Sequence, residues 1–351
     1  MFHGSFKPED VTLLLQPITD VPVVTKEEKE ALIAAGGHYS DVVVSESVPS
    51  VQQRATYLKA LSHMEQRLAL GVNSLAFDII HDACFGDEIV LISLVRAGTP
   101  LGVLLKRAIS RQTHKQVFHY GVSIIRDRGI DPVAMNYIME KHSQSAEIYF
   151  VDGWTGKGTI FKSLKKSLLE SEYWSERDLI KTVVFSDPAR TAWLSTTNED
   201  LLLPFGVLNS TVAGLISRTV YREDGYHGVF VFDNLEEWDW TNKFIESVDE
   251  IMKQHKDAYS PPLKNLTTNL NLSAEVVQNI KVLTDTYDDN KIKPSIAECT
   301  RALLRRVPKM ILVSDNSDPD LQLILSLAKS QGVQVNVANS VYPYKAVAIL
   351  V

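Results

Sequence analysis

The residues whose types and spacing most clearly suggest a chemical function lie in one short segment, "VDGWTGKGTI", at positions 151–160. Asp152 follows an apolar run at 147–151, and a helical pattern, "TIFKSLKKSLL", begins at Thr159. A strand that enters a glycine-rich loop and then a helix is typical of an anion site, because the first amides of the helix lack partners and its dipole favours negative charge. Glycines let the backbone approach a phosphate, and Lys157 adds a positive charge. The segment therefore predicts an anion site.

Two common phosphate motifs do not fit this loop. A Walker A motif requires G-x-x-x-x-G-K-[ST], but Gly153 is only four positions before Lys157, and Gly158 follows the lysine. A dinucleotide fingerprint requires G-x-G-x-x-G, but the pattern that starts at Gly156 reaches Phe161 where the third glycine should stand. The loop is therefore neither of these motifs.

Four apolar segments predict the strands that position this loop. They are residues 87–95, 117–125, 147–151 and 181–187. Helical patterns lie between them, including "TPLGVLLKRAI" and "DPVAMNYIMEKH". Strands that alternate with helices predict an α/β fold with a doubly wound, parallel sheet.

A domain boundary is predicted in "HKDAYSPPLKN", at 255–265, where Pro261 and Pro262 lie between polar residues. Residues 1–260 would then form a first domain. Residues 265–351 again mix helical and strand patterns, and they predict a second, small α/β domain.

The composition narrows the class of protein. The chain has 351 residues and a net charge of −7, from 36 basic and 43 acidic side chains, so the chain as a whole does not bind polyanions generically. It has only two cysteines, Cys84 and Cys299, which excludes a disulfide framework and favours a reducing cytoplasm. No run has the length of a membrane span, and the first residues do not resemble a signal peptide.

The loop after Asp152 resembles the phosphoribosyl-diphosphate loop of type I phosphoribosyltransferases. The resemblance implies that Asp152 accepts hydrogen bonds from the ribose hydroxyls, while the loop wraps the 5′-phosphate. The other residues implied in binding are Gly153, Thr155, Gly156, Lys157, Gly158 and Thr159. That family usually has two adjacent acids at the strand end, and here Gly153 replaces the second.

A second segment, "VLISLVRAGTPLGVLLKRA" at 90–108, resembles the pyrophosphate loop of the same fold, in the form found in uracil phosphoribosyltransferases. The resemblance implies that Arg96, Ala97, Gly98 and Thr99 cradle the leaving pyrophosphate, with Arg96 catalytic alongside Asp152. The reaction would be displacement at ribose C1 through an oxocarbenium-like state. Mg²⁺, held mainly by substrate oxygens and water, would neutralise the diphosphate.

Longer segments resemble one family over nearly the whole chain. They are "GSFKPEDVTLLLQPI", "VRAGTPLGVLLKR", "HYGVSIIRDRGID", "VDGWTGKGTI", "LLLPFGVLNSTVAGLISRTVY" and "YHGVFVF". Their order resembles the tellurite-resistance-cluster phosphoribosyltransferase family with a C-terminal PELOTA RNA-binding domain, some of whose members are labelled StiP-type cysteine proteases. The resemblance implies phosphoribosyl transfer to an unknown acceptor in a stress-resistance context. His227, in "YHG", would lie on the acceptor side or serve as a core histidine.

The C-terminal segment "SIAECTRALLRR" at 295–306 resembles the helix-start motif of Pelota-like and L7Ae-like RNA binders. Ser295 and Ala297 replace the usual glycine and asparagine. The residues implied in RNA binding are Glu298, Thr300, Arg301 and Arg305. Arg301 and Arg305 lie one helical turn apart, so they share a face that can meet phosphates or simply face solvent or the first domain.

Two other functions stay open. The first is a non-catalytic sensor of a nucleotide or phosphoribosyl compound, coupled to RNA binding. The second is a cysteine peptidase, in which Cys84 would need a nearby histidine such as His81 or His227. No protease motif surrounds Cys84, so we interpret both Cys84 and Cys299 as buried structural thiols. The oligomeric state stays open, although folds of the family that the chain resembles often form homodimers.

Overall fold

A computed structural model provides the fold. It describes residues 1–25, 28–29, 31–32, 35–83, 86–174, 179–264, 271–305 and 307–350. Cys84 and Arg306 lie outside the described residues, and of Arg305 only the backbone is described. Among the described helices, none combines the length and the apolar character needed to cross a membrane.

The first domain is built on a seven-stranded sheet with the order β1-β6-β5-β9-β10-β11-β13. All its neighbouring strands are parallel except β11 and β13. The strands are β1 (Thr12–Leu13), β5 (Glu88–Leu94), β6 (Gln116–Val122), β9 (Glu147–Val151), β10 (Lys181–Ser186), β11 (Leu194–Thr197) and β13 (Leu263–Lys264). The predicted strand at 117–125 differs in one respect, because the ladder ends at Val122 and a separate short strand follows Ser123.

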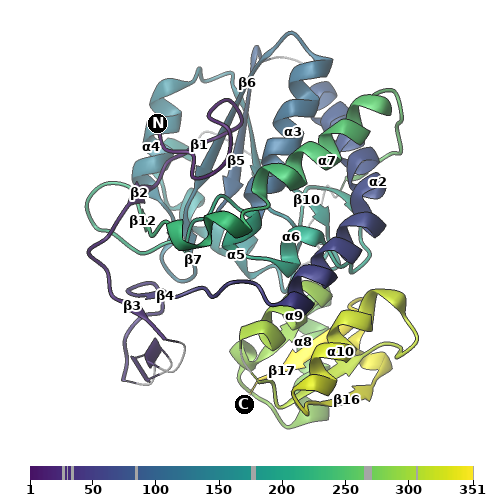
Figure 1. The fold of residues 1–351 in the computed structure, drawn as a ribbon. Helices are drawn as coiled ribbons and strands as arrows, with labels where there is room; N and C mark the ends of the chain where they lie inside the picture. Colours follow the sequence, from purple (N-terminus) through teal and green to yellow (C-terminus); the bar gives the residue numbers. More distant parts are fainter. Residues whose placement is uncertain are drawn as a thin grey trace.

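Helices cover both faces of this sheet (Figure 1). They are α2 (Val51–Asp82), α3 (Gly98–Gln112), α4 (Pro132–Lys141), α5 (Thr159–Leu169), α6 (Pro204–Val207) and α7 (Thr241–Gln254). Alternate residues of β5 enter two cores. Ile89 and Leu91 pack with α2, α3 and α7, whereas Val90 and Ile92 pack with α4 and α5. This arrangement confirms the predicted doubly wound α/β fold.

Local sequence signals fix the helix starts. Ser50 and Gln53 form a reciprocal capping box at the start of α2, and Asp131 accepts two backbone N–H groups at the start of α4. Three two-stranded ribbons complete the first domain: β2 (Gln16–Pro17) with β12 (Gly228–Val229), β3 (Val23–Val24) with β4 (Val43–Val44), and β7 (Ile124–Ile125) with β8 (Gly129–Ile130).

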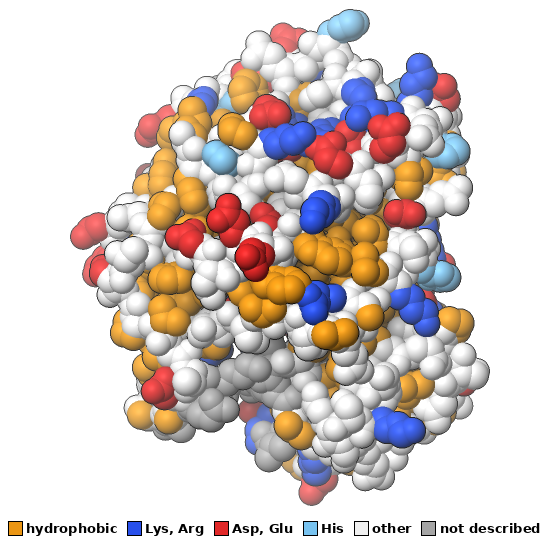
Figure 2. Space-filling view, viewed as in Figure 1, with side chains coloured by type: hydrophobic (Ala, Val, Ile, Leu, Met, Phe, Trp, Pro, Cys, Tyr) orange, Lys and Arg blue, Asp and Glu red, His pale blue; other side chains and the backbone are white. Residues whose placement is uncertain are grey.

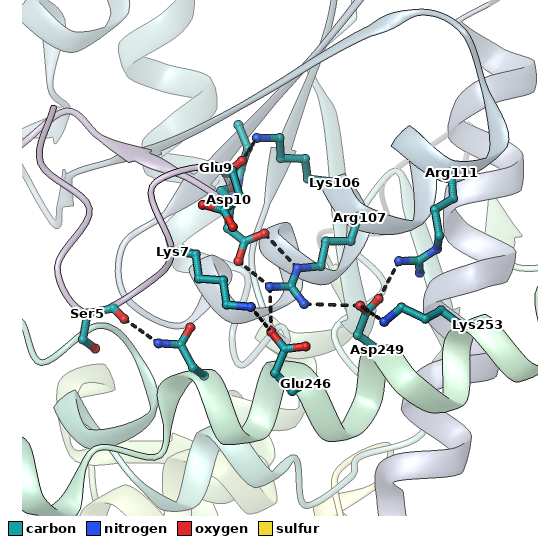
Figure 3. Close-up of polar contacts among 12 residues, drawn as sticks. Ser5, Lys7, Glu9, Asp10, Lys106, Arg107, Arg111, Glu246, Asp249 and Lys253 are labelled. Atoms are coloured by element: carbon teal, nitrogen blue, oxygen red, sulfur yellow. Dashed lines mark hydrogen bonds and ion pairs between the residues drawn. The ribbon is translucent and has the colours of Figure 1, made fainter.

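A network of ion pairs ties the N-terminal segment to α3 and α7 (Figure 3). Arg107 lies at its centre, 2.6 Å from Asp10, 3.0 Å from Glu246 and 3.2 Å from Asp249. Arg111 adds a second contact to Asp249, at 2.6 Å. Figure 2 shows charged side chains of both signs gathered on this face, where α3 and α7 run. The network anchors the strand β1, which continues the sheet.

The C-terminal domain is a small α/β unit, as predicted. Its sheet has the order β14-β17-β15-β16, in which only β15 and β16 are parallel. Its elements are α8 (Asn271–Thr284), β14 (Ile292–Pro294), α9 (Ile296–Arg305), β15 (Met310–Val313), α10 (Gln322–Ser330), β16 (Gln334–Val337) and β17 (Ala346–Ile349). The domain lies below the first domain in Figure 1, beside the start of α2, where Gln52 donates to Ser326 at 3.0 Å.

Candidate functional site

The two predicted loops meet at the point where the strand order reverses. Among the five long parallel strands, the chain order across the sheet is second, first, third, fourth, fifth, and β5 and β9 lie side by side. Ligands of such sheets bind outside the carboxyl ends of the strands at this point. Gly98 shows how close the loops are, because a Cβ there would lie 2.1 Å from the carbonyl oxygen of Val151. The fold therefore brings residues 96–99 and 152–159 together.

Arg96 is held by protein groups in this arrangement. Its guanidinium lies 2.7 Å from Glu46 and donates to the carbonyl of Ile216 at 2.8 Å, and its side chain is 9% exposed. Ala97 precedes α3 in the helical region, and Thr99 is fully buried with no partner for its hydroxyl among the described residues. The predicted pyrophosphate loop is thus a packed turn whose arginine already has acceptors.

Asp152 lies at the end of β9, half-buried. Its Oδ1 accepts the N–H of Gly153 at 2.8 Å. Burial raises the pKa of Asp152 to about 7, while the Gly153 bond and the charge of Arg301 oppose that rise. Gly153 itself has no room for a second acid, since a Cβ there would lie 2.6 Å from a ring carbon of Phe205. Packing therefore explains the departure from the two-acid pattern.

The rest of the loop is engaged by the protein. Thr155 donates to Asp187 at 2.6 Å and is buried. Lys157 donates to the carbonyl of Asp289, and burial lowers its pKa to about 8. Gly158 adopts a left-handed φ of +70°, which suits glycine at the turn into α5, where Thr159 begins the helix.

The C-terminal domain covers this loop. Tyr344 donates to the carbonyl of Gly156 at 2.8 Å, and Ser273 donates to the carbonyl of Lys157 at 3.1 Å. The guanidinium of Arg301 lies 4.5 Å from the ring centre of Trp154. The loop predicted to bind a phosphate is therefore part of the contact between the two domains.

Two of the predicted RNA-binding residues of α9, Glu298 and Arg301, lie at the same contact. Thr300 is fully buried, with no partner for its hydroxyl among the described residues. Glu298 lies near Gly156 and 3.5 Å from Arg301. This face of α9 is thus turned towards the first domain.

Sequence analysis missed Asp200, which joins the two domains. Its carboxylate is fully buried and accepts the N–H groups of Ile296, at 3.0 Å, and Lys345, at 3.0 Å. It caps the start of α9 from the other domain. A pocket of about 600 Å³ lies beside it, between the domains, with Arg190 and Tyr342 on its wall. The only available signal was an acid in the polar stretch "STTNED", which is equally typical of a loop.

His227 lies away from the loop contact. It is buried, its Nδ1 is 2.7 Å from the hydroxyl of Ser123, and its backbone N–H donates to Asp131 at 2.7 Å. Burial lowers its pKa. The structure thus places this histidine among core partners beyond the carboxyl end of β6.

Of the two cysteines, Cys299 is fully buried in α9. Its thiol donates to the carbonyl of Lys293 at 3.5 Å, and burial raises its pKa well above the usual value. Such a thiol is protonated and has no access to a substrate. Cys84 lies outside the described residues, so its predicted burial stays a prediction.

Comparison with known proteins identifies the two parts of the chain. Residues 4–249 match the family model described as tellurite-like stress resistance cysteine protease StiP, and residues 271–351 match the PELOTA RNA binding domain. A protein of Acinetobacter baylyi named "Cysteine protease StiP" is 37% identical over 367 residues, which span 99% of this chain and 94% of that protein. A hypoxanthine phosphoribosyltransferase from Trypanosoma cruzi, solved with its product IMP, matches 49% of this chain and 90% of that chain, at 15% identity and a TM-score of 0.31.

These names correct the sequence analysis. The predicted phosphoribosyl transfer is wrong, because the relative that spans 99% of the chain is named a cysteine protease and the matching family carries the same description. The cysteine peptidase was the least favoured of the three hypotheses. The expected Mg²⁺ ion and the boundary at 255–265 stay untested predictions, whereas the RNA-binding domain is present. The chain belongs to the StiP family of tellurite-like stress resistance cysteine proteases.

Proposed function

We propose that this protein is a cysteine protease whose nucleophile is Cys84. The observation that carries the proposal is the 37% identity, across 99% of the chain, to a protein named a cysteine protease. The sequence contains two cysteines, and the buried, protonated thiol of Cys299 cannot attack a peptide. By elimination, the thiolate must come from Cys84.

His81 is the histidine best suited to act as the base. It is exposed, and it lies three positions before Cys84 in the chain. Its Nδ1 is 2.8 Å from the carbonyl oxygen of Phe77, which can only accept, so Nδ1 carries the proton and Nε2 is left as the acceptor. The Phe77 ring, with its centre 3.9 Å from that of His81, also holds the imidazole.

The other histidines considered fit less well. His142 has a partner at each ring nitrogen, Tyr120 at 2.9 Å and Glu88 at 3.3 Å. His227 is hydrogen-bonded to Ser123, at the carboxyl end of the sheet, whereas Ala83, the residue before Cys84, ends α2 and precedes the amino end of β5 in the chain. A seven-residue strand separates these edges by about 23 Å, at about 3.3 Å per residue.

The reaction would follow the ordinary thiol peptidase course. His81 Nε2 takes the thiol proton, and the sulfur forms a bond to the peptide carbonyl carbon. The C–N bond then breaks as His81 returns the proton to the leaving amine. Water, deprotonated by His81, hydrolyses the thioester and releases the thiol and a carboxylate.

The test is hydrolysis of fluorescent casein by the full chain and four variants. Cys84→Ser is expected to abolish activity, and Cys299→Ser to retain it within about twofold. His81→Gln should lower kcat by about 100-fold, in the range of general base catalysis. His63→Gln, an exposed histidine on the same helix, is the matched control. Full activity in Cys84→Ser would exclude this nucleophile, and no hydrolysis by the unaltered protein would exclude the protease.

We also infer that residues 271–351 bind RNA, supported by the match to the PELOTA RNA binding domain. Glu298, Thr300, Arg301 and Arg305 are the contacts that the motif suggests. In the present arrangement the first domain lies against Arg301. Fluorescence anisotropy with labelled RNA tests this binding independently of proteolysis.

A further inference from the structure

The first domain carries an exposed group of arginine and tyrosine side chains beside the C-terminal domain. The guanidinium of Arg218 lies 5.0 Å from the ring centre of Tyr39, and that of Arg128 lies 4.0 Å from the ring centre of Tyr221. The backbone N–H of Arg126 donates to the Tyr39 hydroxyl at 2.8 Å. We call these five residues the Tyr39 cluster. Arg128, Arg218 and Tyr221 are exposed, so the cluster is open to a ligand.

Two of its three arginines have no carboxylate partner among the residues that the structure describes. Arg128 lies 3.3 Å from Asp41. Arg126 donates from its guanidinium to the neutral side chain of Asn290, at 3.0 Å. The guanidinium of Arg218 makes no hydrogen bond or ion pair with any residue that the structure describes. In a chain whose net charge is −7, this is a local excess of positive charge.

Further arginines from both domains lie close to this excess. Arg96 binds the carbonyl of Ile216, two residues before Arg218. Arg301 approaches from α9 of the C-terminal domain. The charges of Arg96, Arg301 and Arg126 repel the charge of Arg218. An anion bound here would relieve that repulsion.

We propose that the Tyr39 cluster binds single-stranded RNA, so that the RNA surface of this protein extends from the C-terminal domain onto the first domain. Guanidinium groups contact phosphates, and exposed aromatic faces stack on unpaired bases, which is the combination that single-strand binders use. An acidic peptide would also satisfy the arginines, and the adjacent C-terminal domain is what favours RNA. Asn290 places the cluster next to the domain that matches an RNA binder. The proposal rests on the RNA binding proposed above.

The test measures binding of the full chain to a fluorescein-labelled single-stranded RNA of about 12 nucleotides, within the usual site size. Arg126→Gln and Arg218→Gln each remove one charge from the cluster. Lys141→Gln is the matched control, because Lys141 is exposed and lies 5.2 Å from the ring centre of Tyr137, at the end of α4. Thermal unfolding of each variant establishes that it is folded.

We expect each arginine variant to bind about tenfold more weakly, and the salt dependence of log K to become less steep by about 0.7 per lost contact. Lys141→Gln should bind like the unaltered protein. If both arginine variants bind like Lys141→Gln, the cluster is not an RNA site, although RNA binding by residues 271–351 would stand. If the unaltered protein binds no RNA, both proposals fail. Displacement of RNA by polyglutamate at equal charge concentration would overturn the choice of RNA over an acidic peptide.

Discussion

The guanidinium of Arg301 stacks on the indole of Trp154, with 4.5 Å between the charge centre and the ring centre. Trp154 belongs to the loop after β9, and Arg301 belongs to α9 of the other domain. Trp154 is only 8% exposed. The pair therefore fixes the C-terminal domain over the loop at the switch point of the main sheet.

Replacement of Arg301 by Met keeps an unbranched apolar side chain but removes the charged guanidinium. The stacking energy of such a desolvated pair is about 1–2 kcal/mol, so the C-terminal domain should separate from the first more often. Amide hydrogen exchange at Ile296 and Lys345, whose N–H groups bond to Asp200 across the contact, is expected to accelerate.

Arg54→Met provides the control for that prediction, because Arg54 lies 4.2 Å from the ring centre of Trp238 within the first domain. Exchange at Ile296 and Lys345 should be unchanged in this variant. Equal exchange rates in the two variants would show that the Arg301 pair does not hold the domains together.

The contribution of Asp152 to the free energy of unfolding is expected to fall as the pH rises from about 4 to about 7. Burial raises the pKa of Asp152 from an ordinary 3.8 to about 7, so the folded protein holds a proton that the unfolded chain releases. The stabilisation is complete below the unfolded pKa and is lost as the pH passes the folded pKa. Asp200 has a similarly raised pKa, also from burial, and adds to the same trend.

Asp152→Asn should reduce the pH dependence of the free energy of unfolding. The part of that dependence that comes from Asp200 should remain. Urea unfolding at pH 4.5, 6 and 8 measures the effect. Asp224→Asn, at an exposed position, should keep the full dependence of the unaltered protein. An Asp152→Asn profile that parallels the Asp224→Asn profile would contradict the prediction.

Gly153→Ala is expected to destabilise the first domain by about 1–3 kcal/mol, the usual cost of overpacking. Its Cβ would lie 2.6 Å from a ring carbon of Phe205 and 3.2 Å from the carbonyl oxygen of Ala97. Gly156→Ala is the matched variant, since its nearest neighbours would lie at 3.5 Å and 3.6 Å, which are ordinary contacts. Thermal unfolding of both variants tests this prediction, and equal melting temperatures would contradict it.

Asp249→Ala should cost about 1–3 kcal/mol, because Arg107 loses one of its three carboxylate contacts and Arg111 loses its contact at 2.6 Å. The Asp249 side chain is 4% exposed and contacts Arg107, Arg111 and Lys253. Glu250→Ala, one position along α7 and exposed, should change the stability by less than about 0.5 kcal/mol. Chemical denaturation measures both, and a small loss in Asp249→Ala would mean that Arg107 is satisfied by Asp10 and Glu246 alone.

Local pattern predicted the strands of the main sheet well. The segments at 87–95 and 147–151 became β5 and β9 almost unchanged, because strands covered on both faces need continuous apolar runs. The end of β6 at Val122 was not predictable, since it depends on Ser123 bonding to Thr219 at 2.8 Å, a partner 96 residues away.

The candidate site was predicted less well, for a related reason. The residues of the loop after Asp152 suggested phosphate chemistry, but the contacts that occupy them come from Tyr344 and Ser273, far along the chain. The spacing of glycines says how a loop can bend, not which surface it will meet. Gly153 stands where the resembled family usually has a second acid. The ring of Phe205 explains the glycine by packing alone, because it leaves no room for a side chain there.

The cap that Asp200 places on α9 also has a consequence for synthesis. The Asp200 carboxylate accepts the backbone N–H groups of Ile296 and Lys345, and Lys345 lies 145 residues later in the chain. Chains are synthesised at about 5–20 residues per second, so Lys345 is made roughly 7–30 s after Asp200. During that interval the nascent first domain exposes the Asp200 carboxylate and the Trp154 ring, which the C-terminal domain later covers. Chaperones can bind these groups before the C-terminal domain folds.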